Sequence, residues 1–141
     1  MPLVGGGGAP NVVGGGAPAG VGSSINYIGN HVYGASGVVS SDGTNELTLL
    51  EFNTASQSYI ISKVQYAMST TADVDFVCRL YFDNQIVMQL NQRAGSSTNN
   101  TEINPSVIDI MLPPETKVKV TMQSGSGGRD FSSVIVGEVY G

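Results

Sequence analysis

The chain has 141 residues, including 19 Gly, one Cys, one His and no Trp, and its formal net charge at pH 7 is −5. This length allows one domain with a buried core. The single Cys excludes a disulfide framework within the chain and a multi-cysteine zinc site, and the acidic balance argues against broad binding to nucleic acid. No apolar run is long enough to cross a membrane, and the start of the chain lacks the pattern of a secretory signal. These exclusions favour a β-rich structural or binding protein, for which we expect no catalytic, cofactor or metal site.

The first 23 residues differ in composition from the rest. Residues 1–22 hold nine of the 19 Gly and three of the six Pro, and no Asp, Glu, Lys or Arg occurs before Asp42. Glycine loses the most backbone freedom on ordering, so this segment has little tendency to form a helix or strand by itself. The sequence therefore divides into an extended Gly/Pro-rich N-terminal arm, residues 1–23, and a domain formed by residues 24–141.

The arm carries five larger apolar side chains that are candidate anchors for protein interaction: Leu3, Val4, Val12, Val13 and Val21. Ordering the arm costs roughly 20–40 kcal/mol of conformational entropy, whereas burying these side chains returns roughly 15 kcal/mol at most. A flexible tail or linker is the usual interpretation of such a composition. The alternative is that the arm becomes ordered against another subunit, where its backbone adds to a sheet edge.

From Ser24 onward the pattern is that of β-strands. Residues 25–33 and 46–53 predict two short strands. Residues 58–69 predict a longer strand in which Lys63 and Gln65 point outward. The inward positions of this strand are Ile60, Val64, Tyr66 and Met68.

The clearest signal is a hairpin that begins at residue 73. Residues 73–82 alternate strictly and give one apolar face, formed by Val74, Phe76, Cys78, Leu80 and Phe82. Asp83-Asn84 tolerates the positive φ of a tight turn. In the returning strand we expect Ile86, Met88 and Leu90 to face inward.

Three more strands follow the hairpin. Residues 106–112 end at Pro113-Pro114, which cannot donate to a ladder, and their apolar face is Ile108, Ile110 and Leu112. Residues 116–122 alternate in the same way, with an inward face of Val118, Val120 and Met122 and an outward face of Lys117, Lys119 and Thr121. Residues 131–140 predict the last strand.

Turn-forming residues cluster at 40–45, 54–57, 93–104 and 123–130. About eight short antiparallel strands predict two packed sheets, arranged as a jelly roll or as an immunoglobulin-like sandwich. The Cys-Trp-Cys spacing of immunoglobulin domains is missing. We therefore predict an all-β antiparallel sandwich with the jelly-roll arrangement, preceded by the arm.

Few residues carry reactive side chains. His31 has no partner nearby in sequence for catalysis or metal binding, which favours a structural or surface role. Cys78 lies on the inward face of its strand, where a thiol packs as a small apolar group. Asp73, Asp75 and Asp83 carry the oxygen ligands that Ca²⁺ prefers, but they match no calcium-binding loop, so we interpret them as solvated.

Two surface features suggest contacts. Lys117 and Lys119, together with Arg129, would make a small basic spot, which we interpret as protection of a sheet edge or alternatively as a contact with an acidic neighbouring subunit. A carbohydrate site needs exposed aromatic rings, and the candidates are Tyr27, Tyr33, Tyr59, Tyr81 and Tyr140.

Four stretches carry a resemblance: the arm over residues 1–22, LYFDNQI at 80–86, MLPPET at 111–116 and VGEVYG at 136–141. Together they resemble the jelly-roll cement or decoration proteins of tailed-phage capsids and, more broadly, single-jelly-roll virion structural proteins. The resemblance implies jelly rolls that trimerise over junctions of the shell and arms that lie across neighbouring subunits. It implies no catalytic residues.

The leading hypothesis is a non-enzymatic virion protein that decorates or cements a bacteriophage capsid. Its expected partners are other copies of itself, as a homotrimer, and the major capsid protein or neighbouring virion subunits. Its expected location is the capsid surface, after synthesis in the host cytoplasm. The alternative is the receptor- or glycan-binding head of a viral tail or spike, with residues 93–104 and 123–130 as recognition loops. A third hypothesis, a small hydrolase, would depend on His31.

Overall fold

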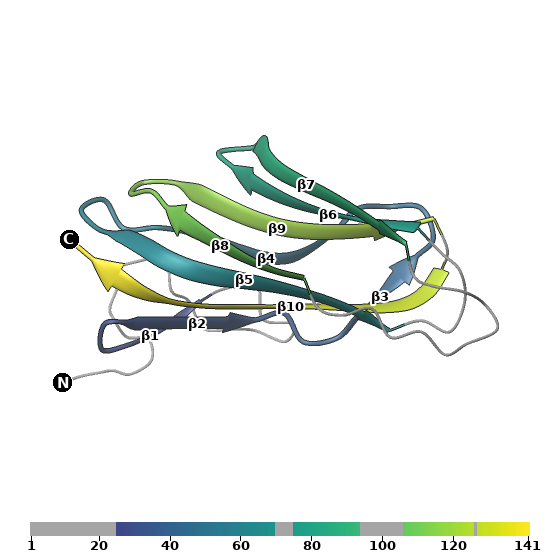
Figure 1. Ribbon diagram of the computed structural model, residues 1–141, viewed down its shortest axis with the longest axis horizontal. Coiled ribbons are helices and arrows are strands. Elements are labelled where there is room, and N and C mark those ends of the chain that lie inside the picture. Colours follow the sequence, from purple (N-terminus) through teal and green to yellow (C-terminus); the bar gives the residue numbers. More distant parts are fainter. Residues whose placement is uncertain (1–24, 70–74, 94–105, 126) are drawn as a thin grey trace.

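The chain folds into two stacked β-sheets (Figure 1). The computed structural model describes residues 25–69, 75–93, 106–125 and 127–141, which contain ten strands and no helix. In chain order the strands are β1 (Asn26–Ile28), β2 (His31–Ala35), β3 (Val39–Asp42), β4 (Leu47–Asn53), β5 (Tyr59–Ser69), β6 (Asp75–Phe82), β7 (Gln85–Arg93), β8 (Ser106–Leu112), β9 (Lys117–Ser124) and β10 (Gly127–Tyr140). The predicted arm, residues 1–23, lies outside the described residues.

The strand pairing defines a jelly roll. Sheet A has the order β1-β2-β10-β5-β8, with β3 also paired to β10, and sheet B has the order β4-β9-β6-β7. All pairs are antiparallel. When β1 is left aside and β2 and β3 are taken as one interrupted strand, the first of the eight strands pairs with the last, the second with the second-last, and so on inward to β6 and β7. This wrapping confirms the predicted fold class.

The core lies between the two sheets and consists of the inward positions of the alternating strands. Val118, Val120 and Met122 are fully buried on β9, and Phe76, Cys78 and Leu80 are buried on β6. On β5 the predicted inward residues Ile60, Val64, Tyr66 and Met68 are all buried. The period of two predicted these positions correctly, because successive side chains of a strand point to opposite faces.

The predicted hairpin is confirmed as β6 and β7, and its turn uses positive backbone angles at Asp83 (φ 50°) and Asn84 (φ 69°). One inward assignment is wrong. Leu80 pairs with Met88 but Tyr81 pairs with Ile86, which leaves Val87 as an extra residue in β7. This bulge reverses the alternation, so Ile86 is 51% exposed.

Several strand boundaries differ from the sequence prediction. Residues 25–33 turn at Gly29, where φ is +61°, and so contribute to two strands, β1 and β2. The predicted turns at 40–45 and 123–130 partly belong to strands, because β3 pairs with the start of β10. β10 has 14 residues and is the longest strand, since it lies in the middle of sheet A and pairs with β2, β3 and β5. β8 ends at Leu112, directly before Pro113, as predicted.

Candidate interaction surface

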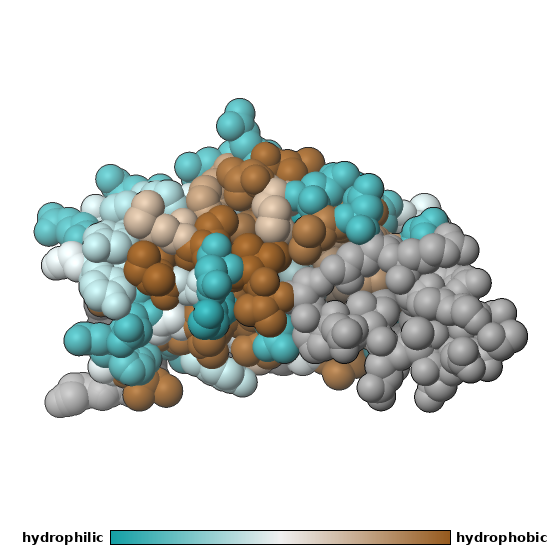
Figure 2. Space-filling model, in the orientation of Figure 1, coloured by the Kyte–Doolittle hydropathy of each residue, from teal (hydrophilic) through white to brown (hydrophobic). Residues whose placement is uncertain are grey.

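The outer face of sheet A exposes apolar side chains from four neighbouring strands. Tyr33 on β2 pairs across the sheet with Val136 on β10, and Ile61 on β5 pairs with Met111 on β8. With Val107 these residues are between 42% and 53% exposed. In Figure 2 hydrophobic side chains gather over the middle of the molecule, where β8, β5 and β10 lie. We call this group of five residues the apolar face.

Four charged or titratable residues on the same side form two pairs. Lys63 Nζ lies 2.6 Å from Asp109 Oδ1, and His31 Nε2 lies 3.9 Å from Glu138 Oε1. All four side chains are more than half exposed, so the pairs add little stability. The pairs place acidic and basic groups together beside the apolar side chains. This lowers the local net charge, which would otherwise oppose contact with a neutral protein surface.

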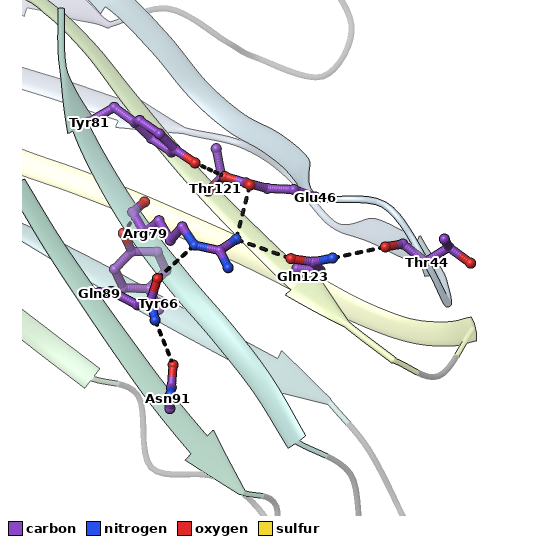
Figure 3. Close-up of polar contacts among 9 residues, drawn as sticks. All are labelled: Thr44, Glu46, Tyr66, Arg79, Tyr81, Gln89, Asn91, Thr121 and Gln123. Atoms are coloured by element: carbon purple, nitrogen blue, oxygen red, sulfur yellow. Dashed lines mark hydrogen bonds and ion pairs between the residues drawn. The ribbon is translucent and has the colours of Figure 1, made fainter. Parts of the chain in front are cut away.

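The outer face of sheet B has a different chemistry, because its polar groups bind one another (Figure 3). Glu46 lies just before β4, and its carboxylate reaches over β9 and β6. Arg79 Nη1 donates to Glu46 Oε1 at 2.9 Å, Tyr81 donates to Oε2 at 2.6 Å, and the Thr121 hydroxyl also donates to Oε2. Thr121 points outward as predicted, yet it is only 1% exposed, because Glu46 covers it.

The network extends from Arg79 in both directions. Arg79 Nε donates to the Gln89 side chain at 2.9 Å, and Nη1 donates to Gln123 at 3.0 Å. Gln123 in turn donates to the backbone oxygen of Thr44 at 2.9 Å. Side chains thereby tie three strands of sheet B, β6, β7 and β9, to the loop before β4, and we call this network the brace.

Glu46 is held in its ionised form. Burial works against the charge, but the hydrogen bonds from Thr121 and Tyr81 and the positive charge of Arg79 outweigh burial and lower the pKa of Glu46 below its usual value. The hydrogen bond to this carboxylate is in turn the main reason why the pKa of Tyr81 is raised. A carboxylate with three donors is suited to bracing the sheet rather than to accepting a proton from a substrate.

The predicted basic spot does not form as expected. Lys117 and Lys119 lie on β9, which is a central strand of sheet B, whereas Arg129 lies on β10 of sheet A. Protection of an edge is therefore the wrong explanation, since β4 and β6 flank β9 on both sides. Lys117 instead pairs with Glu51 at 3.2 Å, and Lys119 lies 4.5 Å from the centre of the Tyr81 ring.

The candidate tyrosines are dispersed over the fold. Tyr59 and Tyr140 stack at one end of sheet A with ring centroids 5.6 Å apart, whereas Tyr81 lies on sheet B beneath Lys119. Tyr27 is partly buried, and its hydroxyl is shielded from solvent without a hydrogen-bond partner. Of the two predicted recognition loops, residues 94–104 lie outside the described residues and residues 123–130 belong largely to β9 and β10.

The remaining predicted residues fall as follows. Leu3, Val4, Val12, Val13 and Val21, like Asp73 and Val74, lie outside the described residues. His31 is exposed at the start of β2, Cys78 is fully buried, and Asp83 accepts a hydrogen bond from the backbone of Lys117 at 2.9 Å.

Within the described ranges no three His, Cys, Asp or Glu side chains come close enough to hold a metal ion. No helix in that part of the chain could cross a membrane.

Sequence reasoning missed the two features that distinguish the sheet faces. The apolar face had a visible signal, because Ile61, Val107 and Met111 occupy outward positions where alternation predicts polar residues. The Glu46 network had no visible signal in the sequence, since Glu46 is 33 residues from Arg79 and 75 residues from Thr121.

No family model matches the sequence, and no curated protein matches it. Among solved structures, a similar chain occurs in the structure of infectious bursal disease virus, Gx strain. The two chains are 16% identical, with a TM-score of 0.40 over 89% of this chain. This chain spans 38% of the length of that one.

Proposed function

We propose that this protein is a non-enzymatic structural subunit of a virus particle that decorates or cements the capsid shell of a tailed phage. Jelly rolls of this topology occur in viral capsid domains and in lectins, so the fold is compatible with both functions. The chemistry of the surface has to distinguish between them. The observation that carries the proposal is the apolar face. Partly exposed apolar side chains from four adjacent strands surround the Lys63–Asp109 ion pair, and such a grouping is typical of a protein contact surface.

In this proposal the apolar face of sheet A contacts the shell, and the brace on sheet B keeps the block rigid. Binding through a preformed sheet requires little ordering of the domain itself, so more of the contact energy is retained as affinity. Copies joined as a homotrimer by their arms bind a symmetric shell with several faces at once, which raises the overall affinity without any new kind of contact. Its place is then the capsid surface, after synthesis in the host cytoplasm.

The test is cosedimentation of the full-length protein with empty shells of the virus that encodes it. We expect the wild type to sediment with the shells and the double variant Ile61→Lys, Met111→Lys to remain in solution, because two added charges on the apolar face oppose its desolvation. Val38→Lys is the matched control, since Val38 is 71% exposed and lies outside the apolar face. A wild type that stays in solution, or a double variant that binds as well as the wild type, would refute the proposal.

A further inference from the structure

The strands β7 and β8 border the same side of the sandwich. The Tyr66 hydroxyl on β5 donates to the Arg79 carbonyl on β6 at 2.9 Å, so β5 and β6 face each other across the core. On the other side of this contact β10 packs against β9 and β4. Because β8 lies beyond β5 in sheet A and β7 lies beyond β6 in sheet B, both form the same boundary.

Among the residues that the structure describes, the part of the core along this boundary is only partly covered. Met88 and Leu90 on β7, and Ile108 and Ile110 on β8, point toward the core but are only partly buried. Their cross-strand neighbours Leu80, Cys78 and Val64 are fully buried. In the described part of the chain β7 pairs with β6 and β8 pairs with β5, so each is a terminal strand of its own sheet. We call the four partly buried residues the open side.

Both strands along the open side also have a free edge with little protection. Natural edge strands are usually kept short or carry charges, as β1 does with three residues and β4 does with Glu51. β7 has nine residues and a single charged one, Arg93, at its end. β8 has seven residues, and its single charge, Asp109, is paired with Lys63. A free edge beside apolar side chains provides the two requirements for the addition of a strand.

We propose that the open side binds the N-terminal segment of a second copy of this chain, with residues 1–24 adding to the free edge of β8 and covering the four residues of the open side. The inference rests on the proposed function and gives the arm its docking site. Residues 1–24 contain no Asp, Glu, Lys or Arg, so no charge is desolvated when they cover this apolar boundary. Their many glycines let the backbone approach closely, while Val12 and Val13 supply apolar contacts.

The position of Ile25 allows exchange between copies. Ile25 directly precedes β1, which forms the edge of sheet A opposite to β8. Four strand spacings separate the two edges, about 19 Å, so the segment starts away from its own open side. Extended, 24 residues reach up to about 80 Å, which is enough to join a neighbour. Such contacts run head to tail and close into a ring, which fits a homotrimer.

The inference is tested by complementation between two full-length variants in a sedimentation experiment. Val12→Asp with Val13→Asp disables the segment and leaves the open side intact, whereas Ile110→Lys disables the open side and leaves the segment intact. We expect the wild type to form a closed oligomer and each variant alone to be monomeric. An equimolar mixture of the two variants should form a dimer, since that pair retains one working contact.

Thr48→Lys is the matched control, because Thr48 is exposed on β4, the edge strand on the other side of sheet B, and this variant should assemble like the wild type. Circular dichroism checks that the Ile110→Lys variant folds. If that variant does not fold, Met88→Lys is used in its place. Variants that assemble like the wild type, or a mixture that stays monomeric, would overturn the inference. Shell binding is measured separately. A wild type that is monomeric but binds shells would refute only the inference. A wild type that forms oligomers but does not bind shells would refute only the proposed function.

Discussion

Glu46 and Arg79 form an ion pair of 2.9 Å that joins the loop before β4 to β6, the first strand of the β6–β7 hairpin. Both side chains are largely shielded, with 28% of Glu46 and 19% of Arg79 exposed. Partial burial makes this pair worth more than a fully solvated one, since loss of one member leaves the other short of partners in a region with little water. It is the centre of the brace on sheet B.

The first prediction concerns the charge of Glu46. Glu46→Gln keeps the shape of the side chain but leaves the Arg79 guanidinium without a carboxylate, so we expect the free energy of unfolding at pH 7 to fall by about 1–2 kcal/mol. Urea denaturation followed by circular dichroism measures it. Glu51→Gln is the control, because the pair of Glu51 with Lys117 is more exposed, and it should cost about 0.5 kcal/mol or less. Equal losses in the two variants would show that burial of the Glu46 pair has no effect.

The second prediction concerns pH. The pKa of Glu46 is lowered in the folded protein, so its contribution to stability is fully present above the ordinary value of 4.5 and is lost as the pH falls through the folded pKa. Hydrogen bonds from the backbone of Asn45 and Thr44 lower the pKa of Asp42 as well and act in the same direction. We expect the wild type to lose more stability than Glu46→Gln between pH 6 and pH 3, because carboxyl groups take up protons in this pH range. Parallel pH profiles of the two proteins would contradict this.

The third prediction concerns Gly137, where β10 passes close to β5. A Cβ at this position would lie 2.5 Å from the Ile61 carbonyl oxygen and 3.0 Å from the Ser62 Cα, both of which are backbone atoms. Gly137→Ala should therefore destabilise the protein by about 1–3 kcal/mol through strain in the centre of sheet A. Gly125→Ala has open space around it and should leave the thermal midpoint nearly unchanged. If Gly137→Ala left the stability unchanged, β10 and β5 would have to separate easily.

The fourth prediction concerns Cys78. Burial raises the pKa of its thiol to about 12 and shields it from solvent, so a thiol reagent at pH 8 should modify it only as fast as the protein unfolds. The labelling rate, followed by mass spectrometry, should rise with added urea. Val87→Cys places a second thiol on a position that is 46% exposed, and this thiol should react at once. Rapid labelling of Cys78 without urea would place it at the surface.

Much of the core was predictable because alternation is a property of a single strand. The inward positions of β5, β6 and β9 follow from residues two apart, and the Asp83-Asn84 turn follows from the tolerance of these residues for positive φ. The inward assignment of Ile86 failed because a bulge at Val87 leaves no mark in the periodicity. The strand at 25–33 was wrong for a similar reason, since Gly29 allows a turn inside an otherwise regular pattern.

The surfaces were less predictable because they depend on which strands become neighbours. Lys117 and Lys119 were expected to protect an edge, but β9 lies between β4 and β6. The outward apolar residues Ile61, Val107 and Met111 break the alternation within their own strands. Ile61 and Met111 become neighbours only because β5 and β8 pair in register, and the same register places Lys63 and Asp109 between them and Val107.

The amino-acid sequence by itself determined that this protein is an all-β sandwich and which side chains fill its core, because both follow from the side-chain period along each strand. The tertiary structure alone decided that one sheet presents an apolar face, that the other is braced by Glu46, and that the inward residues of β7 and β8 are only partly buried. These features join residues that are distant in the chain, such as Glu46 with Arg79, 33 positions away, and with Thr121, 75 positions away. Their distances are set by hydrogen bonding between strands and by the stacking of the two sheets, which no local pattern encodes.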